Sequence, residues 1–314
     1  MKTLFALTKR NVKMFFKDKG LFFTSLITPV ILLVLYVTFL ANVYRNSFTS
    51  ALPDGLAVSE KLINGMVAGE LMSSILAVCC VTVAFCGNTI MVNDRITGAR
   101  KDILVSPVRR SIISTAYFSG TLFATLIVTL IATVATLIYV ATQGWFLSFA
   151  DVVLLIIDVV LLTSFGTALS CVVNALLRTQ GQAAGVGTIV SAGYGFLCGA
   201  YMPISSFGKG LQNLISLLPG TYGTSLLRNH ALNGVFAEMS KQGFPVEAVE
   251  KVKDGVDCNL YFFGNTVSIG AMYGVLIVAI LVFVALYVLV SYLSANNKNP
   301  LDKVTRKPRK AKQK

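Results

Sequence analysis

The chain of 314 residues contains six apolar stretches that are each long enough to cross a lipid bilayer, and this constrains its fold more than any other feature. A transmembrane helix needs about 20 consecutive, mainly apolar residues. Only 13% of the residues are charged, against about 25% in soluble domains. We therefore expect an all-α integral membrane protein with six transmembrane helices. The predicted spans are about 21–41, 66–92, 111–142, 149–174, 183–202 and 266–293.

The basic residues predict which ends of the spans face the cytoplasm, because cytoplasmic segments are rich in Lys and Arg. Of the 27 Lys and Arg residues, 20 fall in residues 1–20, 93–110, 175–182 and 294–314. Both termini are therefore expected on the cytoplasmic side. The net charge of +13 lies beside apolar spans rather than on one folded face, so nucleic acid is not an expected partner.

Basic segments also flank the whole set of spans. Residues 1–20 alternate apolar and basic positions at helical spacing, which predicts an amphipathic interfacial helix whose lysines contact anionic lipid headgroups. A plain extension of the first span is the alternative. The basic tail, residues 294–314, is expected to lie in the cytoplasm, unfolded and close to lipid headgroups.

A basic, polar interruption at residues 93–110 separates the second and third predicted spans. Its middle predicts a short helix that ends before Pro107, with Leu104 on an apolar edge. A short amphipathic helix held under the membrane is a surface that a soluble partner can bind. We therefore expect a cytoplasmic coupling helix here.

Residues 203–265 are too polar to lie free in hydrocarbon, so an extracellular region is expected between spans 5 and 6. Short half-buried helices are predicted at 207–218 and 222–232, with a break at Pro219 and Gly220 and a hydrophilic insert at 236–265. A disulfide between Cys198 and Cys258 is compatible with the sequence but not required by it.

Motifs for catalysis are absent from the sequence. It contains no G-x-x-x-x-G-K-[ST] nucleotide-binding string and no G-x-S-x-G nucleophile elbow. His230 is the only histidine, which excludes a metal cluster or proton relay built on His, and we expect it to be an ordinary polar residue of the extracellular region. We therefore expect no catalytic residue, metal or cofactor in this chain.

Three acidic residues lie in or beside the predicted spans: Glu70, Asp151 and Asp158. Ionisable groups in a bilayer are costly, so each is a candidate functional residue. Glu70 and Asp151 lie near the outer ends of their spans, whereas Asp158 is the deepest. Asp158 could serve a substrate or a proton, or it could make a structural hydrogen bond to a neighbouring helix.

Two local patterns in the sequence carry a resemblance to a known family. The first follows span 2 and consists of Asp94, Arg95, Gly98, Leu104, Ser106, Pro107, Val108 and Arg110. The second follows span 5 and consists of Gly199, Pro203, Leu218, Pro219, Thr221, Tyr222 and Arg228. With the order and spacing of the spans, they resemble the permease subunits of ABC-2 type transporters, including bacterial drug, lipid and glycan exporters. Asn64 and Gly220 depart from the common pattern, which leaves the subfamily and the substrate open.

The resemblance implies a dimer, of two copies of this chain or of this chain and a related permease, in the bacterial plasma membrane. It further implies two copies of a separate cytosolic ABC ATPase, which bind the ATP and Mg. Residues 1–20 and 93–110 would dock that partner, with 175–182 as a smaller contact, and residues 203–232 would form a partly re-entrant cap. The implied coupling residues are Asp94, Arg95, Gly98, Arg100, Asp102, Leu104, Pro107 and Arg110.

Residues that face the substrate are harder to choose from sequence. Thr82, Phe85, Ser191 and Tyr194 in spans 2 and 5 are candidates for the substrate path, with helix packing as the alternative. The leading function is export of an amphiphile, such as a drug, peptide, lipid or lipid-linked glycan. An ion-coupled secondary transporter that uses Asp158 and a membrane scaffold or immunity protein are the other two hypotheses.

Overall fold

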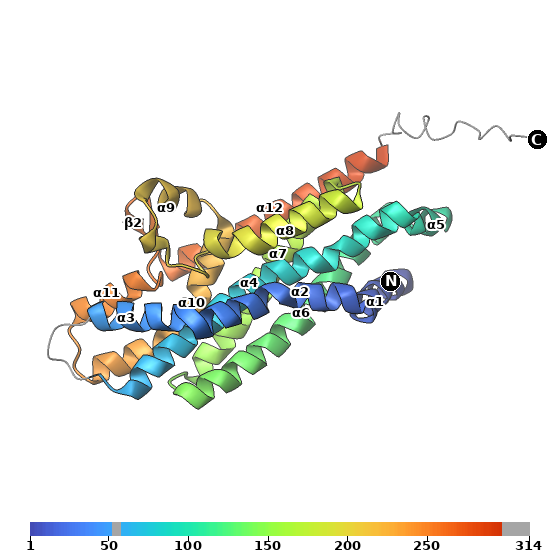
Figure 1. Cartoon of the computed structure of the whole chain (residues 1–314). Coiled ribbons are helices and arrows are strands. Elements are labelled where there is room, and N and C mark those ends of the chain that lie inside the picture. Colours follow the sequence, from blue (N-terminus) through green and yellow to red (C-terminus); the bar gives the residue numbers. More distant parts are fainter. Residues whose placement is uncertain (52–57, 297–314) are drawn as a thin grey trace, which may run out of the picture.

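The computed structural model describes residues 1–51 and 58–296, and nearly all of these residues are helical (Figure 1). Within these described ranges, one small hairpin pairs β1 (Tyr261–Phe262) with β2 (Asn265–Thr266) in antiparallel register. The helices are α1 (Lys2–Lys17), α2 (Lys19–Leu35), η1 (Tyr36–Leu40), α3 (Ala41–Ala51), α4 (Glu60–Thr97), α5 (Ala99–Val105), α6 (Arg110–Gln143), α7 (Phe149–Leu176), α8 (Gln180–Leu197), η2 (Ile204–Ser206), α9 (Lys209–Ile215), α10 (Pro219–Lys241), α11 (Val246–Gly255) and α12 (Ile269–Asn296).

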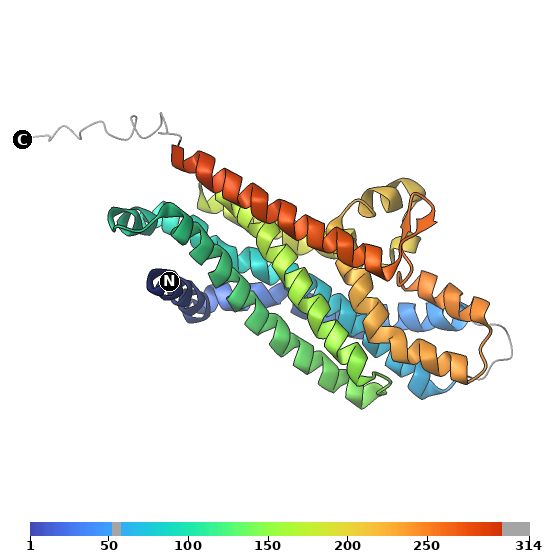
Figure 2. The same ribbon diagram turned by 180° about the vertical axis from the view of Figure 1, so that it is seen from behind.

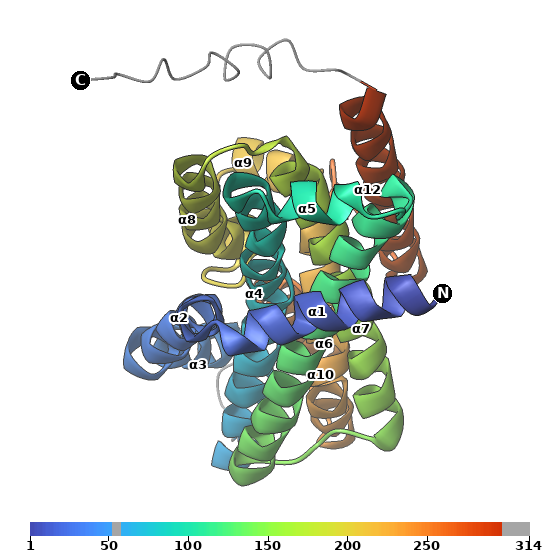
Figure 3. The same ribbon diagram turned by 90° about the vertical axis from the view of Figure 1, so that its right-hand side faces the viewer.

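The long helices form an elongated bundle with two distinct ends (Figure 1). We call them the α5 end, on the right of the figure, and the α11 end, on the left. The N-terminal helix α1 lies across the bundle near the α5 end, over α6, as Figure 3 shows. On the other side of the bundle, α12 runs along α7 (Figure 2).

Five helices among the described residues are long and apolar enough to cross a membrane: Lys19–Asn46, Glu60–Thr97, Arg110–Gln143, Phe149–Leu176 and Ile269–Leu293. The chain is therefore an all-α, multi-pass membrane protein. The predicted fifth span corresponds to α8, which has only 18 residues, and it is not one of the five. Polar Gln180 and Gln182 and several glycines reduce its hydropathy, so the count of six spans stays a prediction.

Helix α4 is the centre of the bundle. It packs against α2, α6, α7, α8 and α10, and residues 68–85 are buried on every face. A helix that is apolar all round needs such a central position. Close approach to α7 depends on Gly166, where an added Cβ would lie 2.6 Å from the carbonyl oxygen of Cys80. Small residues of this kind let helices pack tightly in lipid.

The first span extends further than the sequence predicts. We expected a polar loop from residue 42, but helical structure continues from α2 through the π-helical η1 into α3, which ends at Ala51. Pro29 lies inside α2 without ending it. The polar residues at the start of the expected loop therefore occupy helix turns, and Arg45 there forms an ion pair with Glu60 of α4. The rest of the expected loop includes 52–57, which lie outside the described residues.

The region between α8 and α12 also differs from the expectation. Only Lys209–Ile215 of the predicted helix at 207–218 is helical. The predicted short helix at 222–232 is part of α10, which begins at Pro219, continues to Lys241 and packs on α4, α7 and α12. The expected hydrophilic insert, 236–265, contains the end of α10, then α11 and most of the hairpin.

Candidate functional site: a lateral groove and three buried polar clusters

A lateral groove of about 1010 Å³ lies between α2 and α8. Residues of α2, η1 and α3 form one wall, α8 forms the other, and Cys86, Thr89 and Asn93 of α4 lie between them. The lining is mostly apolar, and Phe39 and Ile31 are exposed. Such a surface suits an amphiphilic molecule, a lipid chain or another helix.

At the α11 end, Arg228 of α10 is the centre of a fully buried ionic cluster. Its Nε atom lies 2.7 Å from a carboxylate oxygen of Glu70 on α4, and a terminal nitrogen lies 2.9 Å from Asp257. The other terminal nitrogen donates to the carbonyl of Gly199 at 2.7 Å and approaches the Ser74 hydroxyl at 3.5 Å. Two carboxylates therefore share one guanidinium in a site without bulk water.

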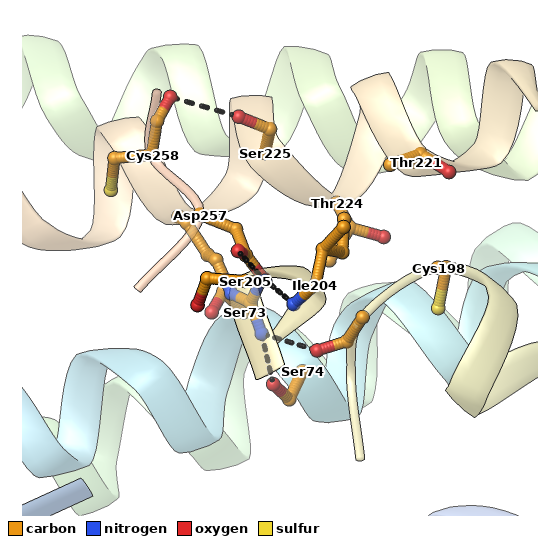
Figure 4. Close-up of polar contacts among 12 residues, drawn as sticks. Ser73, Ser74, Cys198, Ile204, Ser205, Thr221, Thr224, Ser225, Asp257 and Cys258 are labelled. Carbon is orange, nitrogen blue, oxygen red and sulfur yellow. Dashed lines mark hydrogen bonds and ion pairs between the residues drawn. The ribbon is translucent and has the colours of Figure 1, made fainter. Parts of the chain in front are cut away.

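Asp257 holds the connecting segments together as well. Its carboxylate accepts the backbone N–H groups of Ile204 at 2.7 Å and Ser205 at 3.4 Å (Figure 4). Asp257 itself adopts a left-handed backbone conformation with φ of 53°, which is uncommon for a non-glycine residue. The cluster thus fixes the turn after α8 against the segment after α11.

A second cluster joins α7, α10 and α12 inside the bundle. The carboxylate of Asp158 lies 2.5 Å from Nδ1 of His230 and accepts the Tyr273 hydroxyl at 2.6 Å. His230 is therefore buried in the helix bundle, and the expectation of an ordinary residue in a polar extracellular region was wrong. The error arose because α10 was predicted as a short half-buried helix, whereas it packs into the core. Asp158 is 1% exposed, as is Glu70, so both carboxylates are buried inside the protein.

Asp151 lies two turns away from Asp158 on α7 and is buried too. It forms a capping box with Ser148 at the start of the helix, and it accepts the Asn233 side chain at 2.7 Å. Its carboxylate is thus fully used in capping the start of α7 and in contacting α10.

The third cluster lies at the α5 end. Arg10 of α1 donates two hydrogen bonds to Asp94 of α4, at 2.6 and 2.9 Å, and the Tyr117 hydroxyl of α6 donates to the same carboxylate at 2.7 Å. The bond to Asp94 raises the pKa of Arg10. Asn11 reinforces the junction by donating to the carbonyl of Ala116 at 3.0 Å. Helix α1 is thus fastened to α4 and α6 immediately before the loop that we expected to bind a partner.

The eight predicted coupling residues are not equivalent in the structure. Asp94 is buried and cannot contact a partner directly. Arg95 is half-buried and donates to the carbonyl of Leu177, so it links this loop to the turn between α7 and α8. Gly98 separates α4 from α5 with φ of 89°, a conformation that favours glycine.

The remaining coupling residues lie on or beside α5. This helix, all of which is described, buries none of its residues. Leu104 is 38% exposed and the neighbouring Val105 is 88% exposed, so an apolar edge faces away from the bundle. The other predicted residues at this surface are Arg100, Asp102, Pro107 and Arg110.

The second family-like pattern surrounds the Arg228 cluster. Gly199 has φ of 78° and presents its carbonyl to Arg228. Pro203 precedes η2, and Pro219 starts α10. The Thr221 hydroxyl donates to the carbonyl of Ile215 at 3.0 Å, and the Tyr222 hydroxyl donates to that of Ser216 at 2.6 Å.

The four substrate-path candidates fall into two groups. Thr82 and Phe85 are 1% and 5% exposed in the bundle core, where the Thr82 hydroxyl bonds to the carbonyl of Val78 in its own helix. Ser191 lines the groove. Tyr194 packs against the core beside Gly220 rather than lining the groove. Of these four residues, Thr82, Phe85 and Tyr194 thus lie in packing contacts, and Ser191 faces the groove.

All six cysteines lie in the described part of the chain, and each is a free thiol. Cys198 and Cys258 are both buried near the Arg228 cluster, so the structure does not contain the disulfide that the sequence allowed. The groups that sequence reasoning missed were Arg10, Tyr273 and Asp257. Each becomes recognisable only through its partner, because basic, aromatic and acidic residues are common in the segments that contain them.

Comparison with known proteins agrees with this architecture. The sequence model of the ABC-2 type transporter family matches residues 2–231, which extends from α1 into α10. No curated protein matches the chain. The match covers well over half of the 314 residues. The chain therefore belongs to the ABC-2 type transporter family and is a membrane permease component of an ABC-type transporter.

Proposed function

We propose that this permease exports an amphiphilic molecule, powered by two copies of a separate cytosolic ABC ATPase. The family in general works with such an ATPase. The observation that carries the proposal is the exposed apolar edge of α5, formed by Leu104 and Val105 and attached to the central helix α4 through Gly98. An exposed apolar edge on a short helix that continues from the buried helix α4 offers a docking surface to a soluble partner.

The α5 end has the organisation expected for force transmission. Helix α1 is joined to α4 by the Arg10–Asp94 pair, and the turn after α7 is joined by Arg95. A push on α5 therefore acts on α1, α4 and α7 together. With 20 of the 27 basic residues in segments assigned to the cytoplasm, we place this end on the cytoplasmic side, with both termini inside.

The groove supports a path for an amphiphile and an interface between two permease subunits. Both walls are apolar, and α2 and α8 expose large side chains, including Phe23 and Ile189. Two copies related by a two-fold axis would cover these faces and enclose a shared cavity. A homodimer is the simplest arrangement for this surface.

The test is co-purification in detergent with the ATPase encoded beside this gene. We expect a stoichiometric complex that hydrolyses ATP. A triple variant, Arg95→Ala, Gly98→Val and Arg100→Ala, should lose assembly or coupling, because it removes the link to Leu177 and strains the α4–α5 joint. If no ATPase co-purifies with the wild-type chain and the triple variant behaves identically, the proposal is wrong.

Of the two other functions that the sequence left open, ion-coupled transport depends on Asp158. In the structure this carboxylate is occupied by His230 and Tyr273, which suits a structural role. Ion-coupled transport would continue without the ATPase and collapse on addition of a protonophore. A scaffold or immunity protein would retain its function when the partner's ATP hydrolysis is blocked.

A further inference from the structure

One side chain joins four segments of the chain at the α11 end. Arg228 of α10 contacts Glu70 and Ser74 of α4, the carbonyl of Gly199 after α8, and Asp257 after α11. It is 1% exposed. Because the geometry of the guanidinium donors is fixed, these segments can separate only if some of these ion pairs and hydrogen bonds break.

This cluster lies directly behind one end of the lateral groove. Tyr201, Met202 and Pro203, which follow Gly199, line the groove there together with Tyr44 of α3. Tyr44 also packs in one apolar cluster with Cys198, at the start of the turn after α8. The position of this turn, set by Arg228, therefore determines the shape of the groove at its α11 end.

Helix α4 connects the cluster to the opposite end of the molecule. Glu70 and Asp94 lie on one unbroken helix about 24 residues apart, which is roughly 36 Å at 1.5 Å per residue. The helix contains no proline and is packed on all sides through its middle, so it moves as a rod. A displacement of α4 applied beside Asp94 therefore also moves Glu70. Arg228 belongs to α10, so such a displacement shifts Glu70 relative to Arg228.

We propose that Glu70 and Arg228 form a latch that keeps the α11 end of the groove closed and that opens when α4 shifts against α10 during transport. The inference rests on the proposed function, because it takes ATP-driven movement of α4 as the trigger. Both are positioning residues, since they act through the turn after α8 rather than by contact with the substrate.

The charge balance shows which substitution is informative. Arg228 faces two carboxylates, Glu70 and Asp257. Glu70→Gln leaves one guanidinium against one carboxylate, so the charges inside the cluster become balanced while the ion pair to α4 is lost. Removing Arg228 would instead leave two buried carboxylates unpaired, which is strongly destabilising. Asp257→Asn weakens the same latch from the other side.

The chain carries its own reporters for opening. Cys198 and Cys258 precede and follow the latch partners Gly199 and Asp257, and each is 1% exposed. The carbonyl of Cys258 also accepts the Ser225 hydroxyl at 3.0 Å (Figure 4). Cys79 and Cys171 are equally buried in a separate apolar cluster. Local opening should expose the first pair alone, whereas unfolding should expose all four.

The experiment measures N-ethylmaleimide modification of each cysteine, by peptide mass spectrometry, in the full-length chain purified in detergent with its ATPase. Glu70→Gln should speed modification of Cys198 and Cys258 about tenfold, because buried thiols react from a locally opened state. The matched control is Glu60→Gln, which lies on α4 like Glu70 and breaks an exposed ion pair with Arg45 of α3. It should leave both rates unchanged.

Further arms connect the latch with transport. ATP should speed modification of the same two cysteines in the wild-type complex, and Glu70→Gln should lower the amount transported per ATP hydrolysed. The latch is refuted if Cys198 and Cys258 are modified as slowly in Glu70→Gln and Asp257→Asn as in Glu60→Gln. It is equally refuted if both of the first two variants expose all four cysteines together. It is also refuted if a complex that transports shows no effect of ATP on the thiols. If the preparation neither binds an ATPase nor transports, the proposed function fails, while the comparison without ATP still decides whether the latch exists.

Discussion

Asp94 accepts two hydrogen bonds from the guanidinium of Arg10, so the N-terminal helix is joined to the last turns of α4 by a bidentate ion pair. Tyr117 donates to the same carboxylate from α6. Three helices thus meet at one acidic side chain that is 2% exposed. The sequence placed Asp94 in a coupling loop, and the structure shows how it can matter without touching a partner.

Asp94→Ala should detach α1 from the bundle. The substitution leaves Arg10 and Tyr117 without their shared acceptor. We expect a loss of about 2 kcal/mol, because the buried bond from Tyr117 to a charged acceptor contributes about 1.5–3 kcal/mol, whereas the partly exposed Arg10 regains contact with water. Thermal unfolding of the purified protein in detergent provides the measurement. Lys13→Ala, on the exposed side of the same α1, is the control and should change little. Equal stability of the two variants would show that the junction contributes nothing.

The contact between α4 and α7 should tolerate no enlargement at Gly166. An added methyl group there would lie 2.6 Å from the carbonyl of Cys80 and 2.9 Å from the Cα of Val81. Gly166→Leu should therefore push the helices apart, with a cost above the about 1–3 kcal/mol typical of an overpacked core. Gly274→Leu in α12 is matched in size, and a Cβ added there meets no atom within 4 Å. If the two variants express and unfold alike, the close packing is not needed for stability.

The Asp158 cluster should be structural. Asp158→Ala removes the acceptor of both His230 and Tyr273, and we expect a loss of about 3 kcal/mol, because each buried donor left unsatisfied costs about 1–3 kcal/mol. Val160→Ala, which shortens an exposed side chain on the same helix, is the control. Because His230 is the only histidine, isotope labelling of histidine gives one NMR signal, which should shift in Asp158→Asn.

Transport provides the decisive comparison for this cluster. Asp158→Asn keeps the shape of the side chain, and we expect ATP-driven transport to continue at a reduced rate that follows the amount of folded protein. An ion-coupled transporter would instead lose all transport in Asp158→Asn while the protein remained folded. That result would overturn the structural role.

The exposed edge of α5 should bind the ATPase through its apolar side chains. Val105 is 88% exposed and contributes little to folding. Val105→Asp should weaken the complex about tenfold, as expected for an interface residue worth more than 1 kcal/mol, without changing thermal stability. Leu214→Asp introduces the same charge at an exposed residue of α9 near the other end of the bundle. If both variants bind the ATPase as tightly as the wild-type chain, α5 is not the docking surface.

The apolar stretches were sufficient to predict the class of fold, because length and hydropathy define a membrane-crossing helix without knowledge of its neighbours. The prediction was weakest where polarity and burial disagree. Helix α10 contains Arg228, Asn229, His230 and Asn233, so it was expected to be only half-buried. These four side chains instead find partners on α4, α7 or the segment after α11. A pattern within one helix cannot show such partners.

The candidate site was predictable to a similar degree. Arg228 and Glu70 were each singled out, the first by its family-like pattern and the second as an acidic residue in a span, but nothing in the sequence joins them across the intervening chain. Asp257, the third member of the cluster, lies beyond the region that the family model matches. Pairings between distant residues depend on the packing of α4 against α10, which the sequence alone did not reveal.

The most direct test of the central claim is transport in proteoliposomes that contain this chain with the ATPase encoded beside its gene. The measured quantity is the ATP-dependent movement of a fluorescent amphiphile, compared with vesicles that contain a hydrolysis-deficient ATPase. We predict transport that requires ATP hydrolysis, persists when a protonophore is added and is lost in the triple variant of Arg95, Gly98 and Arg100. Transport that continues without the ATPase, and that the protonophore abolishes, would contradict the assignment of this chain as an ATP-driven export permease.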